Sequence, residues 1–179
     1  MTHNTFIKGA PIWCLLLCIA LLSSCKGRRN HVQPRPTQAK KPEPYVPSGK
    51  IYYDVLAESN RSNTSVVIDV ADQKSFLLVN GRTAAVSPVS TARPGKYTPR
   101  GSFRITERVR SGKISTIYNV GMPYWMRLNS SAYGMHAGHL PGYPASAGCV
   151  RMPTDMAQLF YDNTQSGTRV NIYSSWSGG

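Results

Sequence analysis

The sequence has few acidic residues: eight Asp and Glu stand against 21 Lys and Arg, which gives a formal net charge of +13. Residues 26–50 carry much of the excess, with seven basic residues and one acidic residue. Such a stretch is attracted to anionic polymers or lipid headgroups. No basic and aromatic motif typical of RNA binding accompanies it, so a nucleic-acid partner is not expected.

Long hydrophobic runs are also missing. The apolar run at residues 12–22 is too short to span a bilayer, but with Lys8 before it, it suits the core of a signal peptide. Ser23, Ser24 and Cys25 follow, and this pattern resembles a bacterial lipobox, in which the cysteine becomes the lipidated first residue. We therefore predict a lipoprotein signal peptide at residues 1–24 and lipidation of Cys25. An ordinary signal segment is the alternative.

Cysteine is scarce in the part of the chain expected to fold. Cys14 and Cys18 lie in the predicted signal peptide and Cys25 would carry lipid, so Cys149 is left alone. An exported chain meets an oxidising compartment, where an unpaired thiol is a liability unless it has chemical work to do. Cys149 is therefore a candidate reactive thiol. A buried inert thiol, or one paired between chains, is the alternative.

Residues 25–50 are predicted to be the lipidated cysteine followed by a basic, proline-rich tether. Five prolines lie in residues 31–47 with almost nothing apolar to bury, so this segment should stay solvated and extended. At roughly 3 Å per residue, about twenty residues would let the domain reach some 60 Å from its membrane.

Residues 51–174 are typical of a mainly β domain, with residues 175–179 expected to be frayed. Alternating or β-branched segments predict strands at residues 65–70, 75–79, 82–91, 102–106 and 168–173. Asn80-Gly81 predicts a tight hairpin, and Pro88 predicts an edge or a bend. Short strands at this spacing favour a sandwich or barrel.

One helix is predicted late in the chain. Thr154 can cap it, Asp155 suits its positive end, and Met156, Leu159 and Phe160 fall on one face.

The segment 134–153 carries the clearest chemistry. A thiol is a good nucleophile only as a thiolate, and a nearby imidazole is the usual means of forming one near neutral pH. His136 and His139 both lie within one loop of Cys149, and the amides of Gly148 and Cys149 could donate to an oxyanion. A zinc site formed by His136, His139 and Cys149 is the alternative, but the loop lacks the second cysteine that would favour it.

In this segment the chain resembles the signature of the L,D-transpeptidase (YkuD-type) family: a His, a spacer, then Ser-His-Gly-Cys, an apolar residue and Arg. The matching residues are His136, Ser146, Gly148, Cys149, Val150 and Arg151. Two strands with the Asn-Gly hairpin, the segments 88–91 and 98–101, and the aromatic segment 122–126 precede it in the family's order. The resemblance covers nearly all of residues 64–173.

Two features depart from the family pattern. Ala147 replaces the His that normally precedes Gly-Cys, so a supporting imidazole is lost or is supplied by His139. The spacing from His136 to Cys149 is short, and resembles the short-loop variety with Leu-Pro-Gly-Tyr-Pro. A non-catalytic descendant of the family remains an alternative.

The resemblance implies a peptidoglycan stem tetrapeptide as substrate, without metal or cofactor. Cys149 would attack the carbonyl of the third residue, D-alanine would leave, and His136 would carry the proton. The thioester would pass to a stem amine, to an amine of an envelope protein, or to water. A stem-trimming carboxypeptidase and a non-catalytic wall-binding lipoprotein are the alternative functions.

Other residues are candidates for substrate binding. Arg151 could bind a stem carboxylate or brace the loop. Tyr124, Trp125 and Tyr133 could line a groove for an extended peptide, or be ordinary core and rim. Ser146 suits a turn.

The chain is expected to be a monomer, anchored in the envelope and facing the periplasm. Lys26 after the lipidated cysteine favours the outer membrane by family habit.

Overall fold

The computed structural model describes residues 48–178. The predicted signal peptide, Cys25 and all but the end of the predicted tether lie outside the described residues. Within the described range neither helix is long and apolar enough to cross a bilayer.

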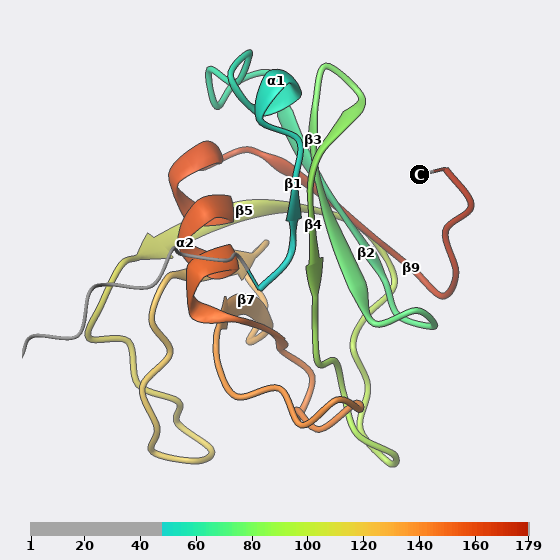
Figure 1. The fold of residues 1–179 in the computed structure, drawn as a ribbon. Coiled ribbons are helices and arrows are strands. Elements are labelled where there is room, and N and C mark those ends of the chain that lie inside the picture. The colour runs from blue at the N-terminus through green and yellow to red at the C-terminus, as the bar shows by residue number, and fades with distance from the viewer. Residues whose placement is uncertain (1–47, 179) are drawn as a thin grey trace, which may run out of the picture. The chain divides into compact units, whose positions relative to one another are not determined.

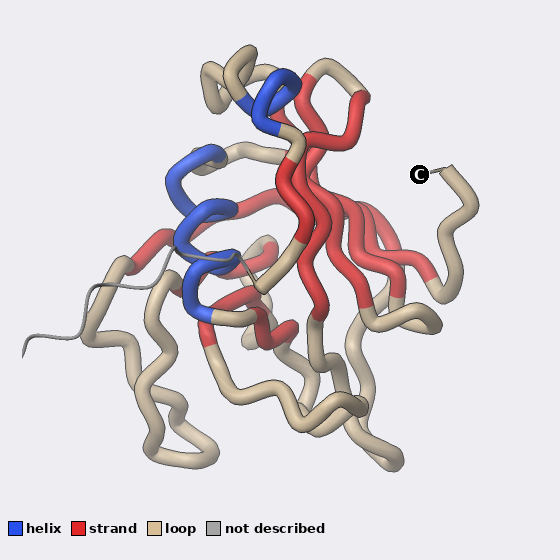
Figure 2. Tube along the Cα trace, viewed as in Figure 1, coloured by secondary structure: helices blue, strands red, loops and turns tan. Residues whose placement is uncertain are grey.

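The described residues form a single curled sheet with two helices. The elements are β1 (Lys50–Ile51), α1 (Tyr53–Leu56), β2 (Thr64–Asp69), β3 (Lys74–Val79), β4 (Arg82–Pro88), β5 (Gly101–Val109), β6 (Trp125–Leu128), β7 (Gly134–Ala137), β8 (Val150–Met152), α2 (Thr154–Asn163) and β9 (Arg169–Tyr173). The strand order is β1-β4-β3-β2-β9-β5-β6-β7-β8 (Figures 1 and 2). The mainly β prediction is confirmed, as a half-barrel with one helix of more than a single turn.

The first hairpin forms as its sequence predicts. β2 and β3 pair antiparallel from Thr64 opposite Val79 to Asp69 opposite Lys74. Asn80 and Gly81 both take positive φ, 49° and 80°, and turn the chain into β4. β4 ends at Pro88, a residue that has no N–H to donate to the ladder.

Two parallel pairings bring distant segments together. β9 lies beside β2, with Val66 opposite Val170, and β8 lies beside β7. The β2–β9 contact joins residues about a hundred positions apart, so local sequence patterns do not predict it, whereas β7 and β8 are joined by one short loop.

The core lies between the concave face of the sheet and α2 (Figure 1). Met156, Ala157 and Phe160 of α2 are fully buried against side chains from β2 to β8, and Leu159 is half-buried beside them. Burying a large apolar side chain contributes roughly 1.5–3 kcal/mol, so this helix fastens the two halves of the curled sheet together.

Two local expectations need correction. Thr154 does not cap α2: it is the first helical residue, and Pro153 is the N-cap, with no side-chain capping bond. The chain end is not loose up to residue 176. The Trp176 ring lies 4.5 Å from that of Phe76, and its amide donates to Asp69 Oδ2 at 2.8 Å.

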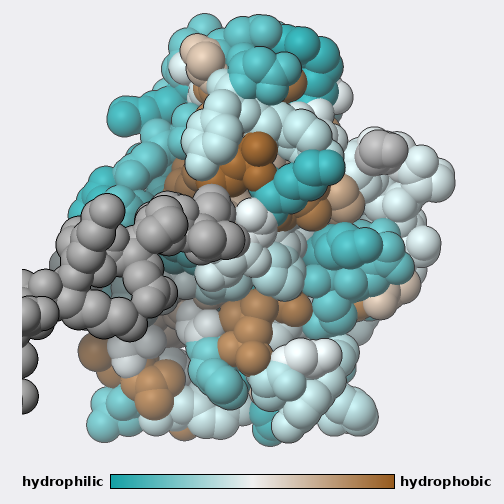
Figure 3. Space-filling view, viewed as in Figure 1, coloured by the Kyte–Doolittle hydropathy of each residue, from teal (hydrophilic) through white to brown (hydrophobic). Residues whose placement is uncertain are grey.

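The loop between β5 and β6 exposes apolar side chains. Ile114, Ile117 and Val120 are 50%, 72% and 53% exposed. Figure 3 shows hydrophobic surface gathered at the lower left, where the yellow loops after β5 lie in Figure 1. Exposed apolar side chains concentrated in one loop indicate a contact surface rather than core.

Candidate active site

The parallel pair β7 and β8 positions the predicted catalytic residues. His136 lies in β7 directly opposite Arg151 of β8. Cys149 comes immediately before β8, at the level where β7 begins, and its sulfur is hydrogen-bonded by the Gly134 backbone. The ladder therefore places Cys149 level with Gly134, two residues from His136 in register, so that the thiol lies beside the strand that carries the imidazole.

Cys149 lies at the junction of two cavities. A cavity of about 530 Å³ is lined by His136, His139, Ala147, Cys149 and Arg151, together with residues of the loop after β5. A smaller one, about 240 Å³, is lined by Cys149, Trp125 and the other side of the same loop. Half-buried Cys149 is thus reachable from two sides.

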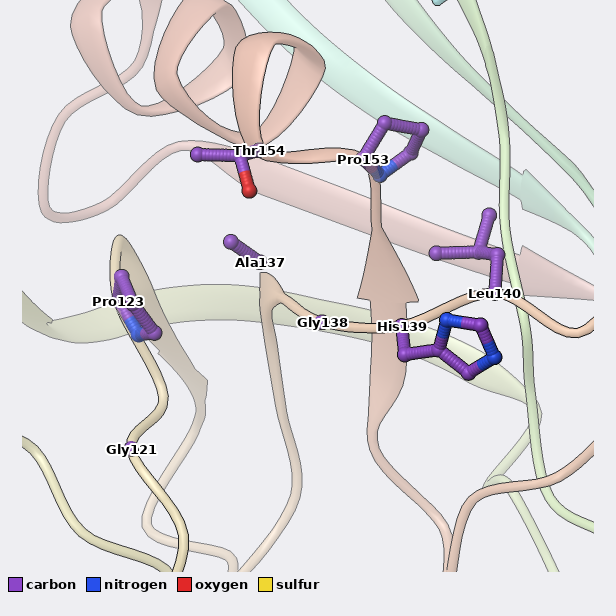
Figure 4. A pocket seen from close by; sticks show the side chains of 8 residues that line it. All are labelled: Gly121, Pro123, Ala137, Gly138, His139, Leu140, Pro153 and Thr154. Carbon is purple, nitrogen blue, oxygen red and sulfur yellow. The ribbon is translucent and has the colours of Figure 1, made fainter.

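A third hollow adjoins the larger cavity at the start of α2. Figure 4 shows Pro123, Ala137, His139 and Thr154 around it, with the His139 ring on the loop that leaves β7. His139, Ala137 and Gly138 line both spaces. The hollow has a volume of about 470 Å³ and extends the site toward α2.

The tautomer of His136 follows from one hydrogen bond. Its Nδ1 lies 2.7 Å from the carbonyl oxygen of Ala137. A carbonyl only accepts, so Nδ1 carries the proton and the neutral ring keeps Nε2 as its basic nitrogen. Burial lowers the pKa of His136. The hydrogen bond to Ala137 acts in the opposite direction, and the positive charge of Arg151 lowers the pKa further. The imidazole is therefore a free base at neutral pH.

The thiol of Cys149 is protonated at rest. Burial raises its pKa, while the hydrogen bond from Gly134 and the positive charge of Arg151 act in the opposite direction. Desolvation penalises the charged form of both groups, so the resting pair is a thiol and a neutral imidazole.

A buried hydroxyl shapes the turn before Cys149. Ser146 Oγ donates to the carbonyl of Cys149 at 2.6 Å and accepts from the amide of Gly148 at 3.0 Å. Ser146 is therefore a turn-former. The Gly148 amide, predicted from sequence as an oxyanion donor, donates to Ser146 Oγ in this arrangement.

Gly148 is required for its shape. Its φ is +143°, and a Cβ there would lie 2.3 Å from the Tyr133 ring and 2.9 Å from the carbonyl oxygen of Tyr97. The Gly148 carbonyl accepts from Thr98 Oγ1 at 2.9 Å. The segment 98–101, flagged in the sequence without a role, thus braces the turn that presents Cys149.

Arg151 braces the loop between the two catalytic candidates. Its Nη2 donates to Ala145 O at 3.0 Å and its Nη1 reaches His139 O at 3.5 Å. Its stem lies against Gly138, where a Cβ would be 3.1 Å from Cδ. Arg151 also lines the larger cavity, so it combines bracing with a positive charge at the site.

Of the three aromatic candidates, the structure brings one to the cavities. Trp125 is buried, lines the smaller cavity, and lies 6.1 Å from the His136 ring between centroids. Tyr133 packs behind Gly148. Tyr124 turns toward α2, where its hydroxyl donates to Gln158 at 3.0 Å. The sequence predicted no such division, because all three are aromatic residues near one motif.

Sequence reasoning missed Glu107, the anchor of Trp125. Its carboxylate accepts from Trp125 Nε1 at 3.1 Å, Arg127 Nε at 2.5 Å and Lys113 Nζ at 3.1 Å. The bonds from Lys113 and Trp125, with help from Arg127, lower the pKa of Glu107 to about 2. The only signal available in the sequence was that acidic residues such as Glu107 are scarce in this basic chain.

Sequence reasoning also missed a contact that ties the loop after β5 to the Cys149 segment. Arg93 Nη1 donates to Tyr118 Oη at 2.5 Å, while the Arg93 amide donates to Ser146 O at 3.0 Å. Tyr118 lines the larger cavity.

Among residues 48–178, no group of three or more His, Cys, Asp or Glu is arranged to hold a metal ion.

Comparison with known proteins identifies the family of this domain. Residues 63–172 match the YkuD family, described as the L,D-transpeptidase catalytic domain. The chain belongs to this family. A curated relative, the putative L,D-transpeptidase YkuD of Bacillus subtilis, is 28% identical over 113 residues, covering 60% of this chain and 64% of the relative. The chain therefore spans less than two thirds of that relative's length.

Solved structures share the fold of this L,D-transpeptidase domain. An L,D-transpeptidase of Xylanimonas cellulosilytica is 27% identical with a TM-score of 0.58, covering 64% of this chain and 63% of that one. L,D-transpeptidase 3 of Mycobacterium tuberculosis, in complex with a faropenem-derived adduct, is 20% identical with a TM-score of 0.55, covering 62% and 60%.

Proposed function

We propose that this L,D-transpeptidase domain acts through a thioester on Cys149, formed with a peptidoglycan stem tetrapeptide, and transfers the acyl group to an amine. The observation that carries the proposal is the His136–Ala137 hydrogen bond, which leaves Nε2 basic on the strand beside Cys149. A buried thiol needs such a base, because it does not ionise by itself at neutral pH.

The proposed reaction has two balanced halves. His136 Nε2 takes the thiol proton as Cys149 sulfur attacks the carbonyl carbon of the third stem residue. The C–N bond to the terminal D-alanine breaks, and the imidazolium returns the proton to the leaving amine. An acceptor amine then attacks the thioester, His136 takes its proton, and the thiolate leaves and is reprotonated.

Transition-state charge on the carbonyl oxygen needs a donor. Because the Gly148 amide is engaged with Ser146, we assign this role to the amide of Cys149. The positive charge of Arg151 in the same cavity supports the developing negative charge.

The two cavities at Cys149 support separate approaches for donor and acceptor. The larger one holds His136, His139 and Arg151, and suits the charged donor stem. Trp125 and the apolar loop after β5 enclose the thiol from the other side, which limits water and favours an amine acceptor over hydrolysis.

The proposed place of action is the cell envelope. A lipid at Cys25 and a tether up to residue 50 would hold the domain facing the periplasm, with the outer membrane favoured. The basic composition of residues 26–50 supports contact with anionic envelope components.

The test uses a soluble form that begins at Lys26, incubated with purified disaccharide-tetrapeptide and analysed by mass spectrometry. A dimer lighter by one alanine is expected. Monomer without the terminal alanine would instead indicate the carboxypeptidase. Cys149→Ala should abolish turnover while the unfolding temperature stays close to that of the parent.

A second measurement separates enzyme from wall-binding module. By analogy with the faropenem-bound relative, faropenem should add mass to the parent chain and none to Cys149→Ala. His136→Gln should slow the adduct strongly, whereas Tyr143→Phe, an exposed control on the intervening loop, should not. Wall binding with neither adduct nor turnover would contradict the proposal.

A further inference from the structure

A separate hollow lies at the end of the sheet away from Cys149. It has a volume of about 530 Å³ and is formed by the first residues of β2 and β9, by Arg104 of β5, and by the loops before β2 and β9. It shares no lining residue with the cavities at Cys149. β2 runs away from it toward the Pro88 end of β4, where Ser90 pairs with Arg151. The two sites are therefore separated by the length of the strands.

The charges around this hollow are all of one sign. Arg61, Arg104 and Arg169 line it, and no acidic residue does. The other lining residues carry hydroxyls or amides, apart from a glycine. Arginine keeps its charge at every physiological pH, so the hollow is permanently positive.

Arg104 and Arg169 are direct partners in the antiparallel β5–β9 ladder. Their neighbours Phe103, Ile105 and Val170 belong to the core, so both arginines project from the opposite, outer face. Like charges directly opposite each other destabilise a sheet. Such a pair is stabilised when an anion lies between the two guanidinium groups.

The part of the chain that the structure describes does not supply that anion. Arg104 Nη1 donates to the Gly167 carbonyl at 2.8 Å, which leaves its charge uncompensated. Within residues 48–178, neither Arg104 nor Arg169 forms an ion pair with a carboxylate. By contrast, Arg82, Arg110 and Arg127 each pair with an Asp or Glu.

We propose that this hollow binds a phosphate group, as a monoester or diester, between Arg104 and Arg169. Guanidinium forks match phosphate oxygens bidentately. One carboxylate is satisfied by a single fork, whereas a phosphate group presents enough oxygens for two. Ser65, the partner of Arg169 on β2, extends the row across the sheet and adds a hydroxyl donor. The inference is independent of the chemistry at Cys149.

The test is calorimetric titration of the full-length chain in neutral detergent with inorganic phosphate and with glycerol phosphate, near physiological salt. Arg104→Gln/Arg169→Gln should weaken binding about tenfold to a hundredfold, as expected for lost charge-assisted bonds. Arg82→Gln removes one positive charge elsewhere, as Arg169→Gln does in the hollow, and should leave the affinity within about twofold. Arg169→Lys, which keeps the charge without the fork, should fall between.

Other outcomes are equally decisive. Failure of the parent to bind phosphate at millimolar concentration, equal binding by the double variant, or equal competition by acetate would overturn the proposal. Arg169→Gln alone leaves the Arg104–Gly167 bond intact, so it reports on binding even if the double variant unfolds. Binding to vesicles of phosphatidylglycerol is compared with binding to soluble glycerol phosphate, to distinguish a lipid headgroup from a free ester. The probe whose affinity for the protein falls more in Arg169→Gln identifies the source of the phosphate group.

Discussion

The Nδ1 atom of His136 lies 2.7 Å from the carbonyl oxygen of Ala137, its neighbour in the chain. Such a contact between adjacent residues fixes the ring without help from a distant carboxylate. It determines which nitrogen stays basic, while burial and Arg151 keep the ring neutral. The orientation and the protonation state of the proposed base thus have separate structural causes.

The pH dependence of turnover follows from these pKa shifts. Because burial lowers the pKa of His136 below its usual 6.5, kcat/KM should fall on acidification with a midpoint below 6.5. Alkylation of Cys149 by iodoacetamide without substrate should stay slow until well into the alkaline range, since burial raises its pKa. A midpoint above 6.5, or fast alkylation at pH 7, would contradict a neutral resting pair.

Gly148→Ala should remove activity and destabilise the domain. The new Cβ would meet the Tyr133 ring at 2.3 Å in a backbone of positive φ, at a cost of about 1–3 kcal/mol. Gly142→Ala is the matched control, since Gly142 also has positive φ but has open space around its Cβ. Urea unfolding should separate the two variants; equal stability and activity would show that the turn relaxes freely.

Tyr118→Phe tests the contact that ties the loop after β5 to the Cys149 segment. It removes the acceptor for Arg93 while keeping the ring over the cavity. A net hydrogen bond of about 0.5–1.5 kcal/mol predicts a KM roughly three- to tenfold higher with kcat little changed. Tyr143→Phe, on the other exposed loop, serves as control. A fall in kcat at constant KM would mean that the contact serves chemistry rather than binding.

Glu107→Gln should alter stability in acid. The pKa of Glu107 is about 2, depressed from 4.5, so its contribution is present above pH 4.5 and is lost as the pH falls toward 2. At pH 7 the variant should be less stable than the parent by about 1 kcal/mol, because the network is partly exposed. Between pH 4.5 and 2 the variant should lose less stability than the parent does. Thermal unfolding against pH measures this.

The matched control for that experiment is Glu58→Gln, because Glu58 pairs with Arg82 on the surface far from Trp125. It should leave tryptophan fluorescence unchanged, whereas Glu107→Gln should shift it by freeing the indole N–H. Identical fluorescence in both variants would argue that Glu107 does not hold Trp125.

His139 is expected to replace the imidazole that Ala147 lacks. Both residues line the cavity at Cys149. His139→Asn should therefore lower kcat about tenfold, a small share of the usual acid–base contribution, and Ala147→His added to it should restore the rate. Unchanged turnover in His139→Asn would show that the exposed His139 ring does not contribute to catalysis.

The candidate pair was accessible from sequence because it is local. Cys149 and His136 lie at the two ends of one stiff loop, and a single cysteine in a domain predicted to be exported already indicates chemistry. Strand positions were predictable for the same reason: β-branched alternation at residues 65–70 and the Asn80-Gly81 turn are short-range signals. The capping of α2 was predicted wrongly, because one residue of shift moves Thr154 from cap to first turn.

The amino-acid sequence by itself determined the β-rich architecture, the family and the residues able to supply a thiolate and a base. Tertiary structure alone decided the His136 tautomer, the engagement of the Gly148 amide, the selection of Trp125 over Tyr124 and the uncompensated Arg104–Arg169 pair. The physical reason is range. Strand propensity and loop spacing act between near neighbours, whereas desolvation, cross-strand register and competition for hydrogen bonds exist only after β7 meets β8 and β5 meets β9.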